Sequence, residues 1–290
     1  MTSEISGESV TGSRRDVSFF AEKSIIFDSP QAFLEGDIRP GLITVEAGGL
    51  NIDVLYEPAG SKTTVVIFHA ALSRENVTLP MFTGRRITQD GPVNRIYVSD
   101  PGLYADPELT LSWYAGTSTL PLQTVLPPII ERLVVEAGGD RLMFFGASGG
   151  GFAAMFYSRL FPESLAVAVN PQTVLKNFPA YTLRQFTERA FPNFTQTEVL
   201  DHAVCSDLRI PYTESFPNYV IYIQNERDDH REKHLEPFLE AIGDKGRVAV
   251  VFGDWGDGHV APPNEYLRDF LSNLTGSPGP WRDAVRAVAS

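Results

Sequence analysis

A serine set among glycines, in the run 146–150 (GASGG), is the residue of this chain best placed for nucleophilic chemistry. Residues 141–145 before it read as a short apolar strand, and the residues after it read as the start of a small-residue helix. A strand that turns at once into a helix forces the residue at the turn into an uncommon backbone conformation and projects its side chain outward. Glycine at positions 146 and 150 removes the side chains that would collide across this turn, and the helix directs its first N–H groups toward the same point. We therefore expect Ser148 to be presented as a nucleophile.

A serine hydroxyl needs a general base, and that base needs an acid to fix its tautomer. The strand-like run 219–224 is followed by a loop that carries Asp228 and Asp229, and the run 247–252 is followed by a glycine-containing loop that ends in His259. In open parallel sheets, ligands lie beyond the carboxyl ends of the strands, where such loops meet. The sequence therefore offers an acid and a base at the edge of the sheet that carries the serine.

Strand-like and helical runs alternate along most of the chain. Strand patterns occur at 18–27, 42–58, 63–68, 94–100, 141–146, 165–170, 219–224 and 247–252, and helical patterns at 120–137, 148–161, 230–242 and 264–274. The first long strand pattern alternates apolar and polar residues across a Gly-Gly pair, as hairpins do, whereas 63–68 is a continuous β-branched run typical of a strand buried on both faces. This alternation predicts an α/β protein with a mainly parallel central sheet flanked by helices. After residue 279 we expect at most a short terminal helix.

Composition and charge exclude several classes of protein. The chain has 290 residues, a net charge of −12 and an isoelectric point near 4.9, which argues against a nucleic-acid partner. A single cysteine, Cys205, allows no internal disulfide. No window of 18 apolar residues exists to span a membrane, and the acidic N-terminus lacks the pattern of a secretory signal. We expect a cytoplasmic protein with a mobile tail at residues 1–14 and one domain over residues 15–290.

No nucleotide cofactor is expected from the glycine-rich segments. The run of three glycines that starts at Gly149 lacks the Lys and Ser/Thr of a phosphate-binding loop, and no G-x-G-x-x-G follows a strand. His230 and His234 lie one helical turn apart, a spacing that can hold a metal, but no third ligand with suitable spacing is found. We interpret them as surface histidines of a helix and predict no metal and no cofactor.

The chain order Ser148, Asp228, His259, with each residue after a strand, resembles the α/β-hydrolase family. The resemblance covers about residues 42–275. It implies that Ser148 is the nucleophile, that His259 is the general base and acid, and that Asp228 orients His259. The neighbouring Asp229 is the competing acid. Asp228 is favoured because the acid of this family commonly stands at the fourth position of its loop, counted here from Asn225.

The resemblance also implies an oxyanion hole made of two N–H donors. One donor is expected from Gly149, the residue after the nucleophile. The other is expected from the loop after the strand 63–68, where the sequence departs from the usual His-Gly pair and has His69-Ala70 instead. We predict Ala71 as this second donor, with Leu72 as the next candidate.

Residues 173–216 interrupt the alternation and are rich in aromatic residues and prolines. In the α/β-hydrolase family, a helical cap covers the active site at this point of the chain. Such aromatics pack in the core of a cap or contact a partly hydrophobic substrate. The residues expected to bind substrate are His69, Trp113, Tyr114, Phe178 and Tyr181, with core packing as the alternative reading of the aromatic side chains.

These observations predict a serine hydrolase that cleaves an ester or thioester of a partly hydrophobic small molecule through an acyl-enzyme on Ser148. The same acyl-enzyme serves an acyltransferase if an alcohol or sugar replaces water as the acceptor. A third hypothesis is a binding protein that keeps the fold and has lost catalysis.

Overall fold

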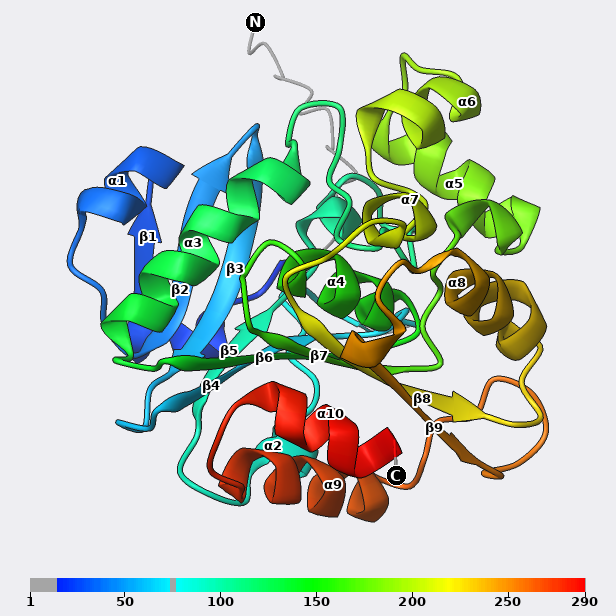
Figure 1. Cartoon of the computed structure of the whole chain (residues 1–290). Helices are drawn as coiled ribbons and strands as arrows, with labels where there is room; N and C mark the ends of the chain where they lie inside the picture. Colours follow the sequence, from blue (N-terminus) through cyan, green and yellow to red (C-terminus); the bar gives the residue numbers. More distant parts are fainter. Residues whose placement is uncertain (1–14, 74–76, 290) are drawn as a thin grey trace, which may run out of the picture.

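A nine-stranded sheet forms the centre of the molecule in the computed structural model, which describes residues 15–73 and 77–289 (Figure 1). The strand order is β1-β2-β3-β5-β4-β6-β7-β8-β9, and only the pairs of β3 with β2 and with β5 are antiparallel. The strands are β1 (Ser24–Phe27), β2 (Gly41–Ala47), β3 (Leu50–Glu57), β4 (Thr63–Phe68), β5 (Asn94–Val98), β6 (Arg141–Ala147), β7 (Leu165–Val169), β8 (Tyr219–Asn225) and β9 (Val248–Gly253). The predicted α/β class with a mainly parallel sheet is confirmed.

Strand burial follows the sequence patterns. All side chains of β4, β7 and β8 are buried, because helices cover both faces of the sheet and leave no polar side for alternation. The hairpin of β2 and β3 turns through Gly48 and Gly49 with φ values of 58° and 78°. Two successive left-handed residues match the twist of a two-residue hairpin, and only glycine adopts them without strain.

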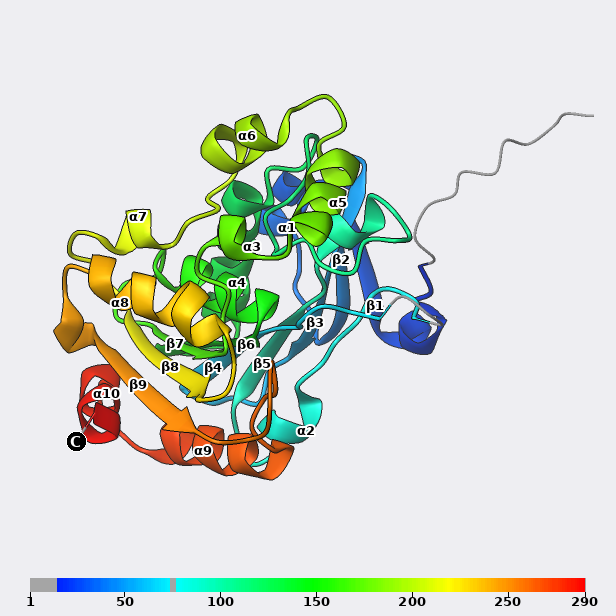
Figure 2. The same ribbon diagram turned by 90° about the vertical axis from the view of Figure 1, so that its right-hand side faces the viewer.

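Helices cover the sheet on both faces, as Figures 1 and 2 show. The helices are α1 (Pro30–Glu35), α2 (Arg85–Thr88), α3 (Leu122–Glu136), α4 (Gly149–Ser158), α5 (Ala180–Ala190), α6 (Gln196–Glu198), α7 (Arg209–Tyr212), α8 (Glu236–Ala241), α9 (Asn264–Gly276) and α10 (Trp281–Ala289). One buried cluster lies between the sheet and α3, α4 and α8, and a second lies between the opposite face and α9 and α10. Among the described residues, no helix is long and apolar enough to cross a membrane.

The two ends of the described chain differ from the sequence prediction. Residues Ser18–Lys23 form a 3-10 helix instead of extending the strand, because Ser18 N donates to Asp16 Oδ1 and Phe20 N donates to Val17 O, which closes a turn. The C-terminal helix α10 is better formed than expected. Its Trp281 is buried, and the guanidinium carbon of Arg141 lies 3.9 Å from the centre of the Trp281 ring. The expected N-terminal tail, residues 1–14, lies outside the described residues.

The segment 173–216 is helical in large part, with α5, α6 and α7 and short 3-10 and π turns between β7 and β8. Its buried apolar side chains join the same cluster that lies beneath α3 and α4. Members of this cluster from the segment include Leu183, Phe186, Phe191, Leu208, Tyr212 and Phe216. Most of its aromatics therefore hold the segment onto the domain. Tyr181 and Phe194 are exposed, and Phe178 is half-buried.

Candidate active site

Ser148 stands at the turn between β6 and α4 in a conformation that few non-glycine residues adopt, with φ 55° and ψ −119°. Such a conformation costs about 1–3 kcal/mol and persists only where neighbouring structure enforces it. Two hydrogen bonds do so here: Ser148 N donates to Val169 O at 2.8 Å, and Phe152 N donates to Ser148 O at 3.1 Å. The strained turn expected from the sequence is present.

The glycines around Ser148 are required by space. A Cβ atom on Gly146 would lie 2.1 Å from the carbonyl oxygen of Gly150, and one on Gly150 would lie 2.6 Å from the carbonyl oxygen of His69. A Cβ on Gly149 would lie 2.3 Å from Leu111 Cδ1. The turn is therefore packed against the end of β4 at His69, and backbone atoms leave space only for glycine at positions 146 and 150.

Asp228 and His259 form a hydrogen-bonded pair. The Nδ1 atom of His259 lies 2.6 Å from Asp228 Oδ2, while Asp228 Oδ1 accepts from His230 N at 3.0 Å. Burial by itself raises the pKa of Asp228, but the hydrogen bonds from His259 and from the His230 N–H outweigh it and leave this pKa below its ordinary value. An ionised Asp228 holds the proton of His259 on Nδ1, so that Nε2 is left as a proton acceptor.

Asp229, the competing acid of the sequence analysis, and two aspartates of the loop before His259 lie elsewhere. Asp229 is exposed and pairs with Lys233, one helical turn away. Asp254 and Asp257 both pair with Arg227, at 2.8 and 2.7 Å. These are exposed ion pairs, and none of them orients His259.

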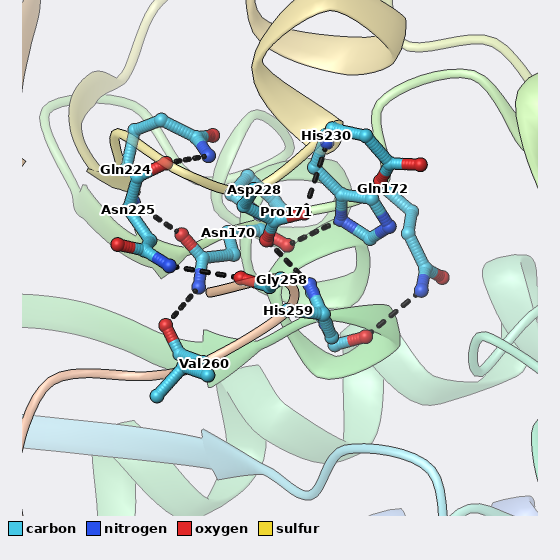
Figure 3. Close-up of polar contacts among 12 residues, drawn as sticks. Asn170, Pro171, Gln172, Gln224, Asn225, Asp228, His230, Gly258, His259 and Val260 are labelled. Atoms are coloured by element: carbon cyan, nitrogen blue, oxygen red, sulfur yellow. Dashed lines mark hydrogen bonds and ion pairs between the residues drawn. The ribbon is translucent and has the colours of Figure 1, made fainter. Parts of the chain in front are cut away.

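Two buried asparagines, which the sequence analysis did not assign to the site, join the loops (Figure 3). Asn170 follows β7 with φ 40°; its Nδ2 donates to Val260 O at 2.9 Å and its Oδ1 accepts from Asn225 N at 2.7 Å. Asn225 Nδ2 in turn donates to the carbonyl oxygens of Gly256 and Gly258, at 2.8 Å each. The signal in the sequence is an amide side chain at the end of each of two neighbouring strands. These contacts fix the His259 loop to the sheet edge.

His230 and His234 are not surface residues, which corrects the expectation from the sequence. Their side chains are 5% and 0% exposed, because the segment 173–216 packs over this helix: Thr173 Oγ1 donates to His234 O, and Val174 N donates to His234 Nδ1. Burial lowers the pKa of His230, and lowers that of His234 to about 3. Both rings are therefore neutral at pH 7.

The three histidine rings lie in a row, with His234 edge-to-face and His259 tilted against the central His230. The ring centre of His230 lies 4.0 Å from that of His259 and 4.7 Å from that of His234. Ligand atoms of Asp228, His230 and His259 lie within 4.8 Å of one another, close enough to hold a metal ion. Two of these groups already have protein partners, since His259 Nδ1 contacts Asp228 and His230 Nδ1 lies 3.2 Å from Asn170 O. Hydrogen bonds within the protein therefore explain why these three side chains lie close together.

The residues expected to contact substrate lie mostly beneath the surface. His69 is 3% exposed; its Nε2 accepts from Asp100 N at 3.0 Å and its Nδ1 lies 2.7 Å from Ala70 O. The hydroxyl of the buried Tyr114 contacts the His69 backbone. Burial also raises the pKa of Asp100 to about 6. His69 and Tyr114 therefore support the loop after β4 as packing residues.

The three other expected contacts differ in position. Trp113 is fully buried, and its ring centre lies 5.6 Å from that of Phe178. Phe178 is half-buried, with its ring centre 6.2 Å from that of His230. Tyr181 is 64% exposed on α5, where its hydroxyl accepts from Gln185 on the same helix. Of these three side chains, that of Phe178 packs against His230, whose backbone N–H donates to Asp228.

Gln172 contacts Ser148, and the sequence analysis did not identify it. Its Nε2 donates to Ser148 Oγ at 2.8 Å, and its backbone N donates to Ser148 O at 3.4 Å. Trp113 Nε1 donates to Gln172 Oε1 from the other side. No local pattern marks this residue, because its two partners lie far from it along the chain.

The predicted oxyanion donors lie at the start of α4 and on the loop after β4. Gly149 N is the first N–H of α4, a position without a partner inside the helix. Leu72 N donates to Thr110 O at 2.8 Å, so this N–H already has an acceptor and the Leu72 alternative loses its basis. Ala71 is exposed on the same loop.

A cavity of about 450 Å³ lies next to the three chain segments of the site. It reaches Ala70 on the loop after β4, Ala147 before the serine, and Ala261 after the histidine. Helix α2 supplies its outer wall with Arg85 and Arg86. A cavity of this size accommodates a small organic molecule.

Comparison with solved structures shows that the chain has the α/β-hydrolase fold. The capsule O-acetyltransferase of Neisseria meningitidis serogroup A superposes with a TM-score of 0.63 at 13% identity, over 84% of this chain and 98% of that one. An S-formylglutathione hydrolase from Agrobacterium tumefaciens gives a TM-score of 0.54 at 16% identity, over 84% and 94% of the two chains. No protein-family model matches the sequence, and no curated protein matches it. The expected α/β-hydrolase fold is confirmed.

Proposed function

We propose that this α/β-hydrolase-fold protein is a serine hydrolase that cleaves a carboxylic ester or thioester of a partly hydrophobic small molecule. The observation that carries the proposal is the strained turn at Ser148, built at the same sheet edge as the hydrogen-bonded pair of the buried Asp228 and the exposed His259. Backbone strain of this kind is maintained where a side chain must be presented for chemistry. A binding protein without catalysis has no need of both the strain and the pair.

In the proposed reaction, Ser148 Oγ attacks the carbonyl carbon while His259 Nε2 accepts the hydroxyl proton. The tetrahedral intermediate collapses, and His259 returns the proton to the leaving alcohol or thiol, which leaves an acyl-enzyme on Ser148. Water then attacks the acyl carbon with His259 again as the base, and the bond to Ser148 Oγ breaks as His259 returns the proton to Oγ and the carboxylic acid leaves. Asp228 remains ionised throughout and stabilises the imidazolium that forms in each half-reaction. The N–H of Gly149 stabilises the oxyanion.

Acyl transfer is the second candidate, and one observation favours it. The structure with the TM-score of 0.63 belongs to an O-acetyltransferase, and another structure of that protein is described as a complex with CoA. The acyl-enzyme of this proposal would serve transfer if an alcohol or sugar reached it ahead of water. Likeness at 13% identity indicates the shared fold, so the choice between water and an alcohol belongs to experiment.

The proposal is tested by exposing the protein to a fluorophosphonate and measuring its intact mass. We expect one adduct on the wild type, none on Ser148→Ala, and an unchanged adduct on Ser277→Ala, which alters an exposed serine after α9. Turnover of short-chain esters with and without added alcohols then separates hydrolysis from transfer. An unlabelled wild type would contradict the catalytic proposal and favour a binding protein.

A further inference from the structure

The side-chain amide of Gln172 is held between Trp113 and Ser148. Gln172 is 1% exposed, and each end of its amide has a hydrogen-bond partner: Oε1 accepts from Trp113 Nε1, and Nε2 donates to Ser148 Oγ at 2.8 Å. The indole N–H of tryptophan is a donor only, so it must face the amide oxygen. The orientation of the amide is thereby fixed, with its NH₂ group directed at the serine.

The backbone at Trp113, which donates to Gln172, is in a strained conformation. Trp113 and Tyr114 are successive left-handed residues, with φ values of 52° and 53°. Non-glycine residues in this conformation are strained and tend to occur at functional sites. The strain is enforced by Asp100, whose Oδ2 accepts from Tyr114 N at 2.8 Å, while Phe186 packs against the indole with ring centres 5.4 Å apart. The indole N–H is thus held in one place.

We propose that Gln172 is a catalytic residue of the Ser148 site, whose amide NH₂ group donates to Ser148 Oγ in the resting protein and to the oxyanion during the reaction. The inference rests on the proposed function. The oxyanion is bonded to the same carbon that Oγ attacks, and the NH₂ group of Gln172 carries two N–H donors, so one can contact Oγ while the other faces the oxyanion without a turn of the amide. Gln172 then acts beside the N–H of Gly149, and Trp113 is a positioning residue that keeps the donor aimed.

The protonation pattern is consistent with this role. Because Nε2 of an amide only donates, Ser148 Oγ accepts from Gln172, and the hydroxyl proton remains available to His259. A preorganised donor costs nothing to orient when charge develops, and removal of one oxyanion donor typically lowers kcat by about 10²–10³-fold.

The test compares Gln172→Met, which keeps the size of the side chain and removes the donor, with wild type on an ester and on its thionoester. A thiocarbonyl sulfur is a weak hydrogen-bond acceptor, so a lost oxyanion donor penalises the ester far more than the thionoester. We expect kcat/KM for the ester to fall about 10²–10³-fold, and the ester-to-thionoester ratio to fall with it. Trp113→Phe should shift the ratio in the same direction by less. Gln123→Met, which breaks two hydrogen bonds to the backbone of Cys205 and none to Ser148, should leave the ratio unchanged.

Two results would overturn the inference. An unchanged ratio in a folded Gln172→Met protein would show that the amide does not reach the oxyanion, even if both substrates react more slowly. If Gln172→Met does not fold, Gln172→Glu keeps the size and places a carboxylate oxygen at Oγ, and wild-type rates in that variant would also overturn it. Fluorophosphonate labelling of wild-type Ser148 separates these results from failure of the proposed function, since an unlabelled wild type contradicts both.

Discussion

His259 Nδ1 lies 2.6 Å from Asp228 Oδ2, and the side chain of Asp228 has no exposed surface while that of His259 is 41% exposed. One member of the pair is anchored inside the domain, and the other is accessible at the edge of the sheet. An imidazole held in this way keeps one tautomer and offers its second nitrogen to whatever lies in front of it. We expect the activity to depend on this contact.

Replacing Asp228 by Asn tests the pair directly. The amide would present an N–H to His259 Nδ1 and favour the tautomer that carries its proton on Nε2, which cannot accept the serine proton. In proteases with this arrangement the corresponding change lowers kcat by about 10⁴-fold, and we expect a loss of about 10³–10⁴-fold in ester turnover. Asp229→Asn, one residue along, breaks only the surface pair with Lys233 and should retain near wild-type turnover. Equal losses in the two variants would contradict the assignment of the acid.

The Ser148 turn should not tolerate a methyl group on Gly146. The added Cβ would lie 2.1 Å from the Gly150 carbonyl oxygen, which belongs to backbone that cannot move aside. We expect Gly146→Ala to lower the unfolding free energy by about 3 kcal/mol or more and to abolish fluorophosphonate labelling. Gly276→Ala at the end of α9 meets no atom within 4 Å and should change stability by no more than about 0.5 kcal/mol. Denaturant unfolding measures both, and a Gly146→Ala protein as stable as Gly276→Ala would refute this packing.

Asn170 should affect catalysis through the position of the His259 loop. Its amide links Val260 O to the end of β8, at 2.9 and 2.7 Å, so loss of the side chain loosens the histidine relative to the serine. We expect kcat to fall about 10–100-fold in both Asn170→Ala and Asn170→Gly. The free energy of unfolding should be about 1 kcal/mol lower for Asn170→Ala than for Asn170→Gly, because alanine is strained at φ 40° and glycine is not. A fall in kcat only in the alanine variant would assign the effect to backbone strain.

His234 makes the protein sensitive to acid. Its pKa is about 3 in the folded protein because of burial and about 6.5 when unfolded, so between these values the unfolded state binds the extra proton. Stability therefore falls as the pH drops from about 6.5 toward 3, by about 1.4 kcal/mol per pH unit at most for this group. His234→Asn removes the titration and keeps an acceptor for Val174 N. We expect a smaller loss of unfolding free energy between pH 7 and pH 5 in this variant, and an equal loss would contradict the burial of a neutral ring.

Local patterns predicted the sheet well. The β-branched run at Thr63–Phe68 coincides with β4, and the hairpin glycines fall where they were expected, because these features depend on neighbouring residues alone. The strand predicted over residues 18–27 is shorter because a hydrogen bond to Asp16 closes a turn within it. The apolar pattern of those residues carries no information about that bond.

The sequence predicted only those residues of the candidate site that follow the ends of strands. Asp228, His259 and Ser148 follow strands, so topology alone brings them to one edge. Gln172 and Trp113 are 59 residues apart and meet through packing that no local spacing encodes. His234 was interpreted as a surface histidine of a helix, yet residues of the segment 173–216 cover it. No local pattern in the sequence indicates that contact.

The most direct test of the account is to trap the acyl group on the protein. The wild type and His259→Ala would each be mixed with a chromogenic ester, quenched in acid within the first turnover, and digested for mass analysis of the peptide that contains Ser148. The account predicts an acyl group on Ser148 in the wild type, released with time as product forms, and none in His259→Ala over the same interval. Turnover of the ester with no acyl group on Ser148 at any time would contradict it.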